Sequence, residues 1–330
     1  MMKSRTLRIA LTVAAAAVLA GCSSSAATPT QKVYTNKDMT VGFIQTGSES
    51  GWRAANTSSF KETATADGIN LKFYDSQNKI ENQITAFNQY IQDPAVNVII
   101  LAAVGTTGYD DVLKAAKAAN KVVVIEDRRI EADASLYYTY IGSDFDKEGN
   151  NGAAAMCTAL KGMSGANVVE IGGDQAASAA IDRAKGFREG IANCTDESIK
   201  ILDTQSAPAW DPVQGKAIME SDLKKYSGQI QGVYAHNDEL AIAAIQAIDA
   251  AGLKAGTDVK VIGFDATADG FKYLIEGTLF ADVECNPLLA PQVYDAASQS
   301  ASPSLGEMKQ ARTSRSLLRT QMRWRRRILV

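Results

Sequence analysis

The sequence predicts an α/β fold with two doubly wound parallel-sheet lobes. Short β-branched runs alternate with amphipathic stretches almost without interruption, which is the pattern of parallel sheets with crossover helices. A run such as Val122–Ile125 is apolar at every position, as expected for a strand with helices covering both faces. The alternation starts again after residue 142, so we expect two similar lobes with a cleft between them.

The first unit begins with a β-branched and aromatic run and continues through alternating stretches. Runs of about four to eight such residues are typical of strands, and apolar residues repeating every three or four positions are typical of helices. In chain order we predict strand Met39–Thr46, helix Trp52–Asp67, strand Asn70–Asp75, helix Lys79–Asp93, strand Val96–Ala103, helix Tyr109–Asn120 and strand Val122–Asp127.

The second unit follows the segment Tyr137–Gly142 and has the same order of patterns. Its amphipathic stretches are again long enough for helices, and its apolar runs are short enough for strands. In chain order we predict helix Phe145–Leu160, strand Asn167–Gly172, helix Ala177–Ala192, strand Lys200–Gln205, helix Asp211–Lys225, strand Gly232–His236, helix Glu239–Ala251 and strand Val259–Phe264.

The N-terminal residues have the pattern of an export leader. Three basic side chains precede the apolar stretch Ile9–Ala20, which is shorter than the ~20 residues that a membrane-spanning helix needs. The tetrad LAGC that ends at Cys22 resembles the lipobox of bacterial lipoproteins, whose cysteine carries the lipid. The resemblance implies a signal peptide over residues 1–21, an extracytoplasmic membrane anchor at Cys22 and a flexible tether over 22–38. An ordinary signal peptide with a chance cysteine is the alternative.

Composition narrows the partners of the chain. With 46% hydrophobic residues, 22% charged residues and a net charge of −3, it is typical of a globular protein and gives no reason to expect nucleic acid. The sequence has one histidine and four cysteines without a CxxC pair, so we expect neither a metal site nor a cofactor.

The cysteines after the leader have structural interpretations. Cys157 and Cys194 fall late in two consecutive crossover units, and outside the cytosol they could form a disulfide. The alternative is that both are small buried residues without a bond. Cys285 is most simply explained as a free, buried cysteine.

Polar side chains follow the strands at their carboxyl ends, where ligands bind in open α/β sheets. Carboxylates, amides and guanidinium groups offer paired donors and acceptors for sugar hydroxyls, while an indole offers a flat face for sugar C–H groups. These residues therefore predict a saccharide site in a cleft that closes over its ligand. The candidates are Glu49, Trp52, Arg53, Asp127, Arg128, Trp210, Asn237, Asp238 and Asp265.

Several of these residues have a structural alternative. Asp238 precedes a predicted helix and could be its N-cap, and the two tryptophans could pack between the lobes. His236 ends a predicted strand and is better explained as structural than as catalytic. Arg183 lies within a predicted helix, where a solvated face is the default interpretation.

Five motifs together resemble the periplasmic sugar-binding proteins of ABC importers, in the ribose, galactofuranose and fructose group. The similarity runs from about Met39 to about Ala297. The motifs are QTGSESGW (Gln45–Trp52), EDRR (Glu126–Arg129), IDRAKGF (Ile181–Phe187), YAHNDELAIAAIQAI (Tyr234–Ile248) and VIGFDATADG (Val261–Gly270).

The resemblance implies the type I periplasmic binding protein fold, with two lobes joined by a three-strand hinge. It implies a first lobe of residues 39–140 plus 287–300, with a returning helix Leu288–Ser300, and a second lobe of residues 141–286. It adds Arg183 to the ligand contacts and supports all the strand-end candidates except Asp238.

The chain departs from the family pattern at three places. The end of the third strand is apolar at Ala103 and Val104, where ribose-type members are often polar. The segment 283–287 contains Glu-Cys-Asn where a glutamine is common, so we place Glu284 among the candidate ligand contacts. Residues 301–330 form a basic tail that is atypical of the family, and we expect it to be disordered; contact with anionic lipid is the alternative.

The resulting functional prediction is an extracytoplasmic lipoprotein, not an enzyme, that captures a monosaccharide as a monomer and delivers it to an ABC permease. The resemblance at the motifs Gln45–Trp52 and Glu126–Arg129 implies a furanose-type sugar such as fructose or galactofuranose. One alternative is a sugar receptor for a chemosensory or two-component sensor. Another is a glycosidase that uses two carboxylates such as Glu49 and Asp265.

Overall fold

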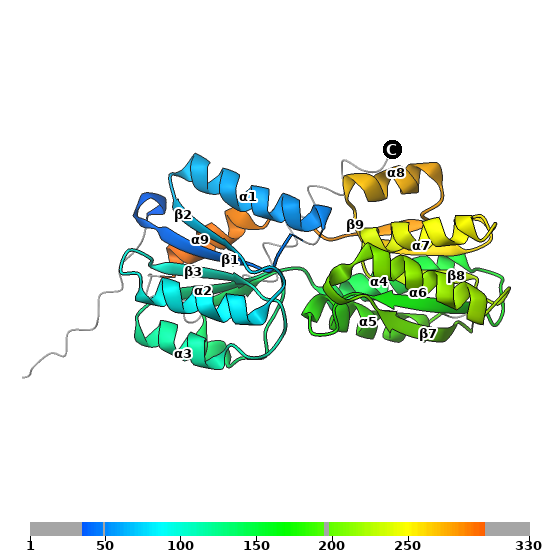
Figure 1. Cartoon of the computed structure of the whole chain (residues 1–330), viewed down its shortest axis with the longest axis horizontal. Coiled ribbons are helices and arrows are strands. Elements are labelled where there is room, and N and C mark those ends of the chain that lie inside the picture. Colours follow the sequence, from blue (N-terminus) through cyan, green and yellow to red (C-terminus); the bar gives the residue numbers. More distant parts are fainter. Residues whose placement is uncertain (1–34, 49, 195–197, 301–330) are drawn as a thin grey trace, which may run out of the picture.

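Two parallel sheets of five strands each define two lobes (Figure 1). The structure is a computed structural model that describes residues 35–48, 50–194 and 198–300. The first lobe contains the sheet β2-β1-β3-β4-β5. Its elements are β1 (Thr40–Gln45), α1 (Gly51–Asp67), β2 (Asn70–Asp75), α2 (Ile80–Gln92), β3 (Val98–Ala102), α3 (Asp110–Ala118), β4 (Val122–Glu126), β5 (Thr139–Ile141) and the late helix α9 (Ala290–Gln299).

The second lobe contains the sheet β10-β9-β8-β6-β7, again with parallel pairing throughout. This order confirms the two-lobed α/β fold. Its elements are α4 (Phe145–Ala159), β6 (Asn167–Gly172), α5 (Ser178–Ile191), β7 (Lys200–Ser206), α6 (Pro212–Lys225), β8 (Gly232–Ala235), α7 (Asp238–Ala250), β9 (Lys260–Asp265), α8 (Ala268–Glu276) and β10 (Ala281–Glu284), with short 3₁₀ helices at Asn36–Asp38, Ala134–Leu136 and Pro208–Trp210.

The chain passes between the lobes after β5 and again after β10. The second passage brings α9 back to the first lobe, where it packs against α1 and β4. There the Tyr294 ring meets the Phe60 ring edge-on at 5.5 Å, within an apolar core formed by β1, β3 and α9. The resemblance implies a three-strand hinge, and the described residues contain two passages between the lobes.

Side-chain N-caps fix the start of two helices, α1 and α7, that carry residues of the site. Ser50 begins α1 because its hydroxyl accepts a hydrogen bond from the Arg53 amide at 3.0 Å, and Gly68 ends the helix with φ 71°. Asn237 begins α7 in the same way, accepting from the Leu240 amide at 3.0 Å. The N-terminal turns of both helices therefore lie at the carboxyl ends of the strands, where the lobes face each other.

Several segments differ from the sequence prediction. The helix α8 and the short strand β10 lie in a region for which we predicted no element. The lobe boundary predicted after residue 140 falls inside β5, which pairs with β4 and so belongs to the first sheet. Residues 36–38, predicted as the end of the tether, form a 3₁₀ helix, and Asn36 donates to Asp67 at 3.2 Å. Residues 22–34 of the tether, including Cys22, the leader and the tail 301–330 lie outside the described residues.

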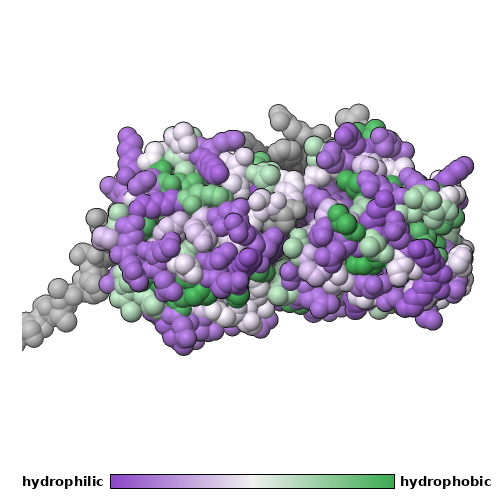
Figure 2. Space-filling model, in the orientation of Figure 1, coloured by the Kyte–Doolittle hydropathy of each residue, from purple (hydrophilic) through white to green (hydrophobic). Residues whose placement is uncertain are grey.

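A disulfide joins Cys157 in α4 to Cys194 just after α5, with the Cα atoms 5.9 Å apart. Cys285 is free and buried. Hydrophilic side chains cover most of the face shown in Figure 2, and hydrophobic ones are scattered between them. Among the described helices, none has the length and apolar character needed to cross a membrane.

Candidate functional site

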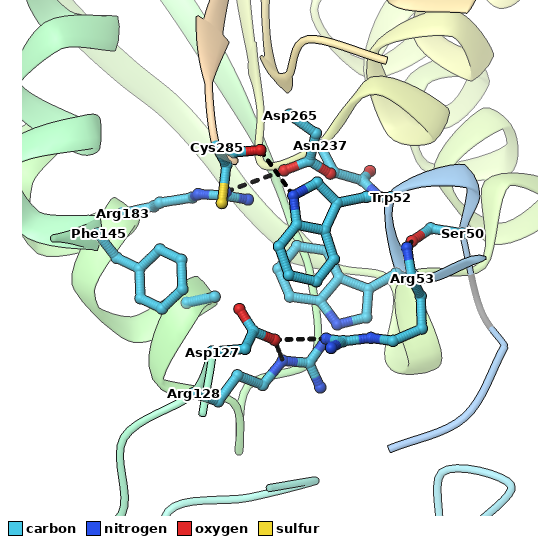
Figure 3. Close-up of a pocket in the computed structure, with 12 residues that line it drawn as sticks. Ser50, Trp52, Arg53, Asp127, Arg128, Phe145, Arg183, Asn237, Asp265 and Cys285 are labelled. Carbon is cyan, nitrogen blue, oxygen red and sulfur yellow. Dashed lines mark hydrogen bonds and ion pairs between the residues drawn. The ribbon is translucent and has the colours of Figure 1, made fainter. Parts of the chain in front are cut away.

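The carboxyl ends of the two sheets enclose a pocket between the lobes (Figure 3). The space between its walls, open solvent included, is about 320 Å³. Both lobes contribute aromatic and charged side chains to it. The lining residues are Ser50, Trp52, Arg53, Asp127, Arg128, Phe145, Ala179, Arg183, Trp210, Asn237, Asp265 and Cys285.

The first lobe contributes a cluster centred on Asp127, in the lower half of Figure 3. The Arg53 guanidinium donates to the Asp127 carboxylate at 2.5 Å, and the Arg128 Nε lies 3.7 Å from the same oxygen. All three side chains are buried. Behind them, Glu126 is fully buried, and burial together with the charge of Asp127 raises the pKa of Glu126 to about 8. This carboxyl group therefore keeps its proton at neutral pH and adds no second negative charge.

The second lobe contributes a cluster centred on Arg183. Its guanidinium donates to Asp265 at 3.0 Å, to Glu148 at 2.9 Å and to the backbone carbonyl of His236. Arg183 is therefore not on a solvated helix face. Burial raises the pKa of Glu148 to about 7, although Arg183 opposes that shift. Burial likewise raises the pKa of Asp265, again against the effect of Arg183.

Two indole rings add apolar faces to the pocket. Trp52 lies in α1 of the first lobe but packs within the apolar cluster of the second lobe, and its Nε1 donates to the carbonyl of Cys285 at 2.7 Å. Trp210 presents its ring to Arg128, whose guanidinium carbon lies 5.5 Å from the ring centroid. The same ring lies close to Gly173, where a Cβ would lie 2.3 Å from ring carbons. Only glycine fits at that position.

The Trp210 indole nitrogen is distinctive because it is buried without a hydrogen-bond acceptor among the described residues. The backbone of Trp210 has φ 60° and that of Ala209 has φ 53°, both in the left-handed region. A buried donor without a partner costs about 1–3 kcal/mol, so a bound acceptor would be favoured here.

Asn237 and Asp238 have different positions despite being neighbours. Asn237 lines the pocket and is the N-cap of α7, so the capping role considered for Asp238 belongs to Asn237. Asp238 is not among the residues that line the pocket, and its carboxylate accepts from the Thr267 amide and hydroxyl at 2.8 and 2.6 Å. Burial and the neighbouring Asp282 raise the pKa of Asp238 to about 9. We therefore withdraw Asp238 from the expected ligand contacts.

Glu284 also lies outside the pocket lining, because its side chain is exposed at the end of β10. The following residue, Cys285, lines the pocket in its place. Glu49, a further candidate, lies outside the described residues. The remaining candidates all line the pocket: Trp52, Arg53, Asp127, Arg128, Arg183, Trp210, Asn237 and Asp265.

Sequence reasoning missed Phe145 and Glu148, which stand at the start of α4. The Phe145 ring lies 5.3 Å from the Arg183 guanidinium carbon, and the Glu148 carboxylate accepts a hydrogen bond from the same guanidinium. Both follow the first passage between the lobes directly, and that position in the chain was the signal that could have identified them.

The described part of the chain contains no group of three His, Cys, Asp or Glu side chains placed to hold a metal ion. His236 instead contacts Glu170 at 2.9 Å, and both are buried. This contact favours the structural interpretation of the histidine.

The sequence profile of the periplasmic binding protein domain matches residues 41–300. The galactofuranose-binding protein YtfQ of Escherichia coli is 43% identical over 261 residues, covering 78% of this chain and 80% of that protein. The fructose import binding protein FruE of Bifidobacterium longum is 33% identical over 301 residues, covering 89% of each.

A solved structure is similar over most of the chain. It is the binding protein of the arabinose ABC transporter from Shewanella sp. ANA-3, bound to α- and β-L-arabinofuranose. It is 42% identical with a TM-score of 0.75, covering 79% of this chain and 85% of that one. With the profile match and these relatives, the chain belongs to the periplasmic binding protein family.

Proposed function

We propose that the chain captures a monosaccharide in its furanose form for an ABC importer and releases it unchanged. Relatives named for galactofuranose and fructose, and a solved relative bound to arabinofuranose, support this class of ligand. Each of these similarities covers more than three quarters of this chain.

The observation that carries the proposal is the pairing of two buried ion clusters with two indoles around one pocket. The Asp127 and Asp265 carboxylates are each held by arginine, so their remaining lone pairs point to acceptor roles toward ring hydroxyls. The indole of Trp210 supplies a donor without a protein acceptor among the described residues. A furanose offers hydroxyls and an apolar C–H surface, which match both kinds of group.

The same contacts favour binding over hydrolysis. A glycosidase needs one carboxyl to donate a proton and a second to attack or activate water. Here Asp127 and Asp265 lie in separate arginine clusters, one in each lobe. Glu49, the other carboxylate considered for that chemistry, lies outside the described residues.

Members of this family work outside the cytoplasm, and we propose that a lipid on Cys22 holds this chain at the membrane as a monomer. The LAGC tetrad and the basic and apolar leader support the anchor. Replacing Cys22 with alanine should move the protein from the membrane fraction to the soluble fraction and abolish labelling by a fatty-acid analogue. Unchanged membrane association of Cys22→Ala would contradict the anchor.

Titration calorimetry of the protein without its leader tests the ligand. We expect heat of binding with L-arabinose, D-galactose or D-fructose, with a furanose-locked methyl glycoside binding more tightly than its pyranose isomer. Chromatography should recover the sugar unaltered after prolonged incubation. No heat with any of these sugars, or a turned-over product, would contradict the proposal.

A further inference from the structure

A carboxylate of the second lobe reaches the first helix of the first lobe outside the pocket. The amide of Gly51, the first residue of α1, donates to the Glu239 Oε1 at 2.9 Å. Glu239 belongs to α7, so this contact crosses the cleft. In Figure 1 the N-terminal end of α1 points toward the second lobe, which makes this contact possible.

The same carboxylate also contacts the pocket. Its second oxygen, Oε2, accepts from the side-chain amide of Asn237 at 2.8 Å. The Asn237 oxygen is already engaged by the Leu240 amide at 3.0 Å, so the orientation of the amide group is fixed. A side-chain amide has two N–H donors. With one directed to Glu239, the other is available to a ligand in the pocket that Asn237 lines.

Elementary electrostatics explains why a carboxylate suits this position. The first amides of a helix have no partners within the helix, and the helix dipole favours negative charge at that end. The Ser50 hydroxyl takes the Arg53 amide, and Glu239 takes the Gly51 amide. The first turn so fixed carries Trp52 and Arg53, both of which line the pocket.

A second contact between the lobes serves as a comparison. Arg129 of the first lobe donates to both carboxylate oxygens of Asp182 in α5, at 2.9 and 2.7 Å. Neither residue lines the pocket. This pair can hold the lobes together, whereas Glu239 in addition contacts a side chain of the pocket.

We propose that Glu239 is a positioning residue that couples the Asn237 amide to lobe closure. In the closed state it orients Asn237 for the ligand with one oxygen and completes the first turn of α1 with the other. This inference rests on the proposed function, because the ligand it positions is the sugar. It predicts that loss of the Glu239 carboxylate speeds dissociation of sugar from the closed complex more than it slows association of sugar with the open form.

The decisive variant is Glu239→Gln, which keeps the shape of the side chain but replaces one acceptor with a donor. Stopped-flow kinetics should show the dissociation rate of the sugar rising about tenfold, with the association rate changed less than twofold. Glu276→Gln, an exposed residue at the end of α8, is the matched control and should change neither rate. Equal rates for Glu239→Gln and the wild type would overturn the proposal.

The variant Asp182→Asn distinguishes the positioning role of Glu239 from a contact that only holds the lobes together. It should raise the dissociation rate by the same factor for a sugar and for its deoxy analogues. Glu239→Gln should weaken the parent sugar more than the deoxy analogue that lacks the hydroxyl bound by Asn237. An identical factor for all analogues in both variants would leave no positioning role and would overturn the proposal.

Hydrogen exchange at saturating sugar, where the lobes are closed, supplies a readout besides the binding rates. Glu239→Gln should speed exchange of the amides in the first turn of α1, with no change in α2 or α3. Unchanged exchange there would also overturn the proposal. If the wild type binds no sugar, the proposed function fails; if it binds sugar but the exchange difference is absent, only the positioning role of Glu239 fails.

Discussion

At the scale of single residues, the pocket is built from unusual backbone conformations. Asp127 has φ 57°, Trp210 has φ 60° and Asp265 has φ 100°, a region in which residues other than glycine are uncommon. Each such residue costs about 1–3 kcal/mol and persists only where its surroundings enforce it. Here the Tyr140 hydroxyl donates to the Asp127 carbonyl at 2.8 Å, and Arg183 holds Asp265. These backbone conformations lower the stability of the fold, and they orient the three side chains in the pocket.

Replacing Asp127 with asparagine tests the first cluster. Asparagine tolerates a positive φ but removes the charge that Arg53 neutralises, so buried Arg53 loses its ionic partner there. We expect sugar affinity to fall by more than tenfold in titration calorimetry, while the circular dichroism spectrum stays native. Asp110→Asn, on the exposed side of α3, is the matched control and should bind as the wild type does. An unchanged dissociation constant for Asp127→Asn would contradict the assigned pocket.

Trp210→Phe tests the indole donor. The change removes a buried N–H group that has no acceptor among the described residues, which would favour the folded state, and it removes that donor from the ligand. We expect affinity to fall several-fold with no decrease in melting temperature. A lower melting temperature with full affinity would show that the indole serves packing alone.

At the scale of elements, the close approach of α4 and α5 delivers the second cluster. A Cβ at Gly186 would lie 2.0 Å from the Asp146 carbonyl, and one at Gly149 would lie 2.4 Å from the Arg183 carbonyl. The two helices therefore pack with their backbones nearly in contact. This spacing lets Glu148 on one helix reach Arg183 on the other.

Gly186→Ala should force these helices apart. We expect a melting temperature several degrees lower and a loss of sugar affinity, because Arg183 would be displaced from Asp265. Differential scanning calorimetry and titration calorimetry measure the two effects. Glu189→Ala, exposed on the same helix, is the control for helix content. Full affinity for Gly186→Ala would show that the helix spacing does not determine the site.

The sequence patterns predicted elements with strong periodicity and missed weak ones. The strand β3 is buried at every position and was predicted, whereas β10 has three partly exposed residues and one exposed residue, without the apolar run that marks a strand. The candidates at strand ends were found because parallel strands end at one edge. Glu148 was missed because a helix position gives no local sign of the guanidinium it contacts. Asp238 was misplaced because either of two adjacent polar residues can cap a helix, and only geometry distinguishes them.

At the scale of the whole molecule, buried carboxyl groups dominate the expected pH dependence. The pKa is raised to about 8 in Glu126, to about 7 in Glu148 and to about 9 in Asp238, with burial as the largest cause in each case. The native protein therefore holds protons that the unfolded chain releases above its ordinary carboxyl pKa. Stability must fall as pH rises through that interval. Glu170, with a pKa lowered to about 2, acts in the opposite direction only in acid.

We accordingly expect the melting temperature to decrease between pH 5.5 and pH 8.5. Asp238→Asn should flatten this dependence, because an amide cannot ionise beside Asp282. Scanning calorimetry across the pH series measures both curves, with Glu276→Gln as the exposed control. A melting temperature that rises over this interval would contradict the assigned protonation states.

The position of Trp52 provides the molecule with an internal optical signal. Its ring comes from one lobe, packs in the core of the other and bonds to the carbonyl that follows β10. Hinge opening would bring this chromophore into water, so its emission should shift to the red, and sugar should reverse the shift. Fluorescence titration of Trp210→Phe would follow Trp52 with less background. An emission spectrum that does not change when sugar is added would show that the environment of the Trp52 ring stays the same as the hinge opens and closes.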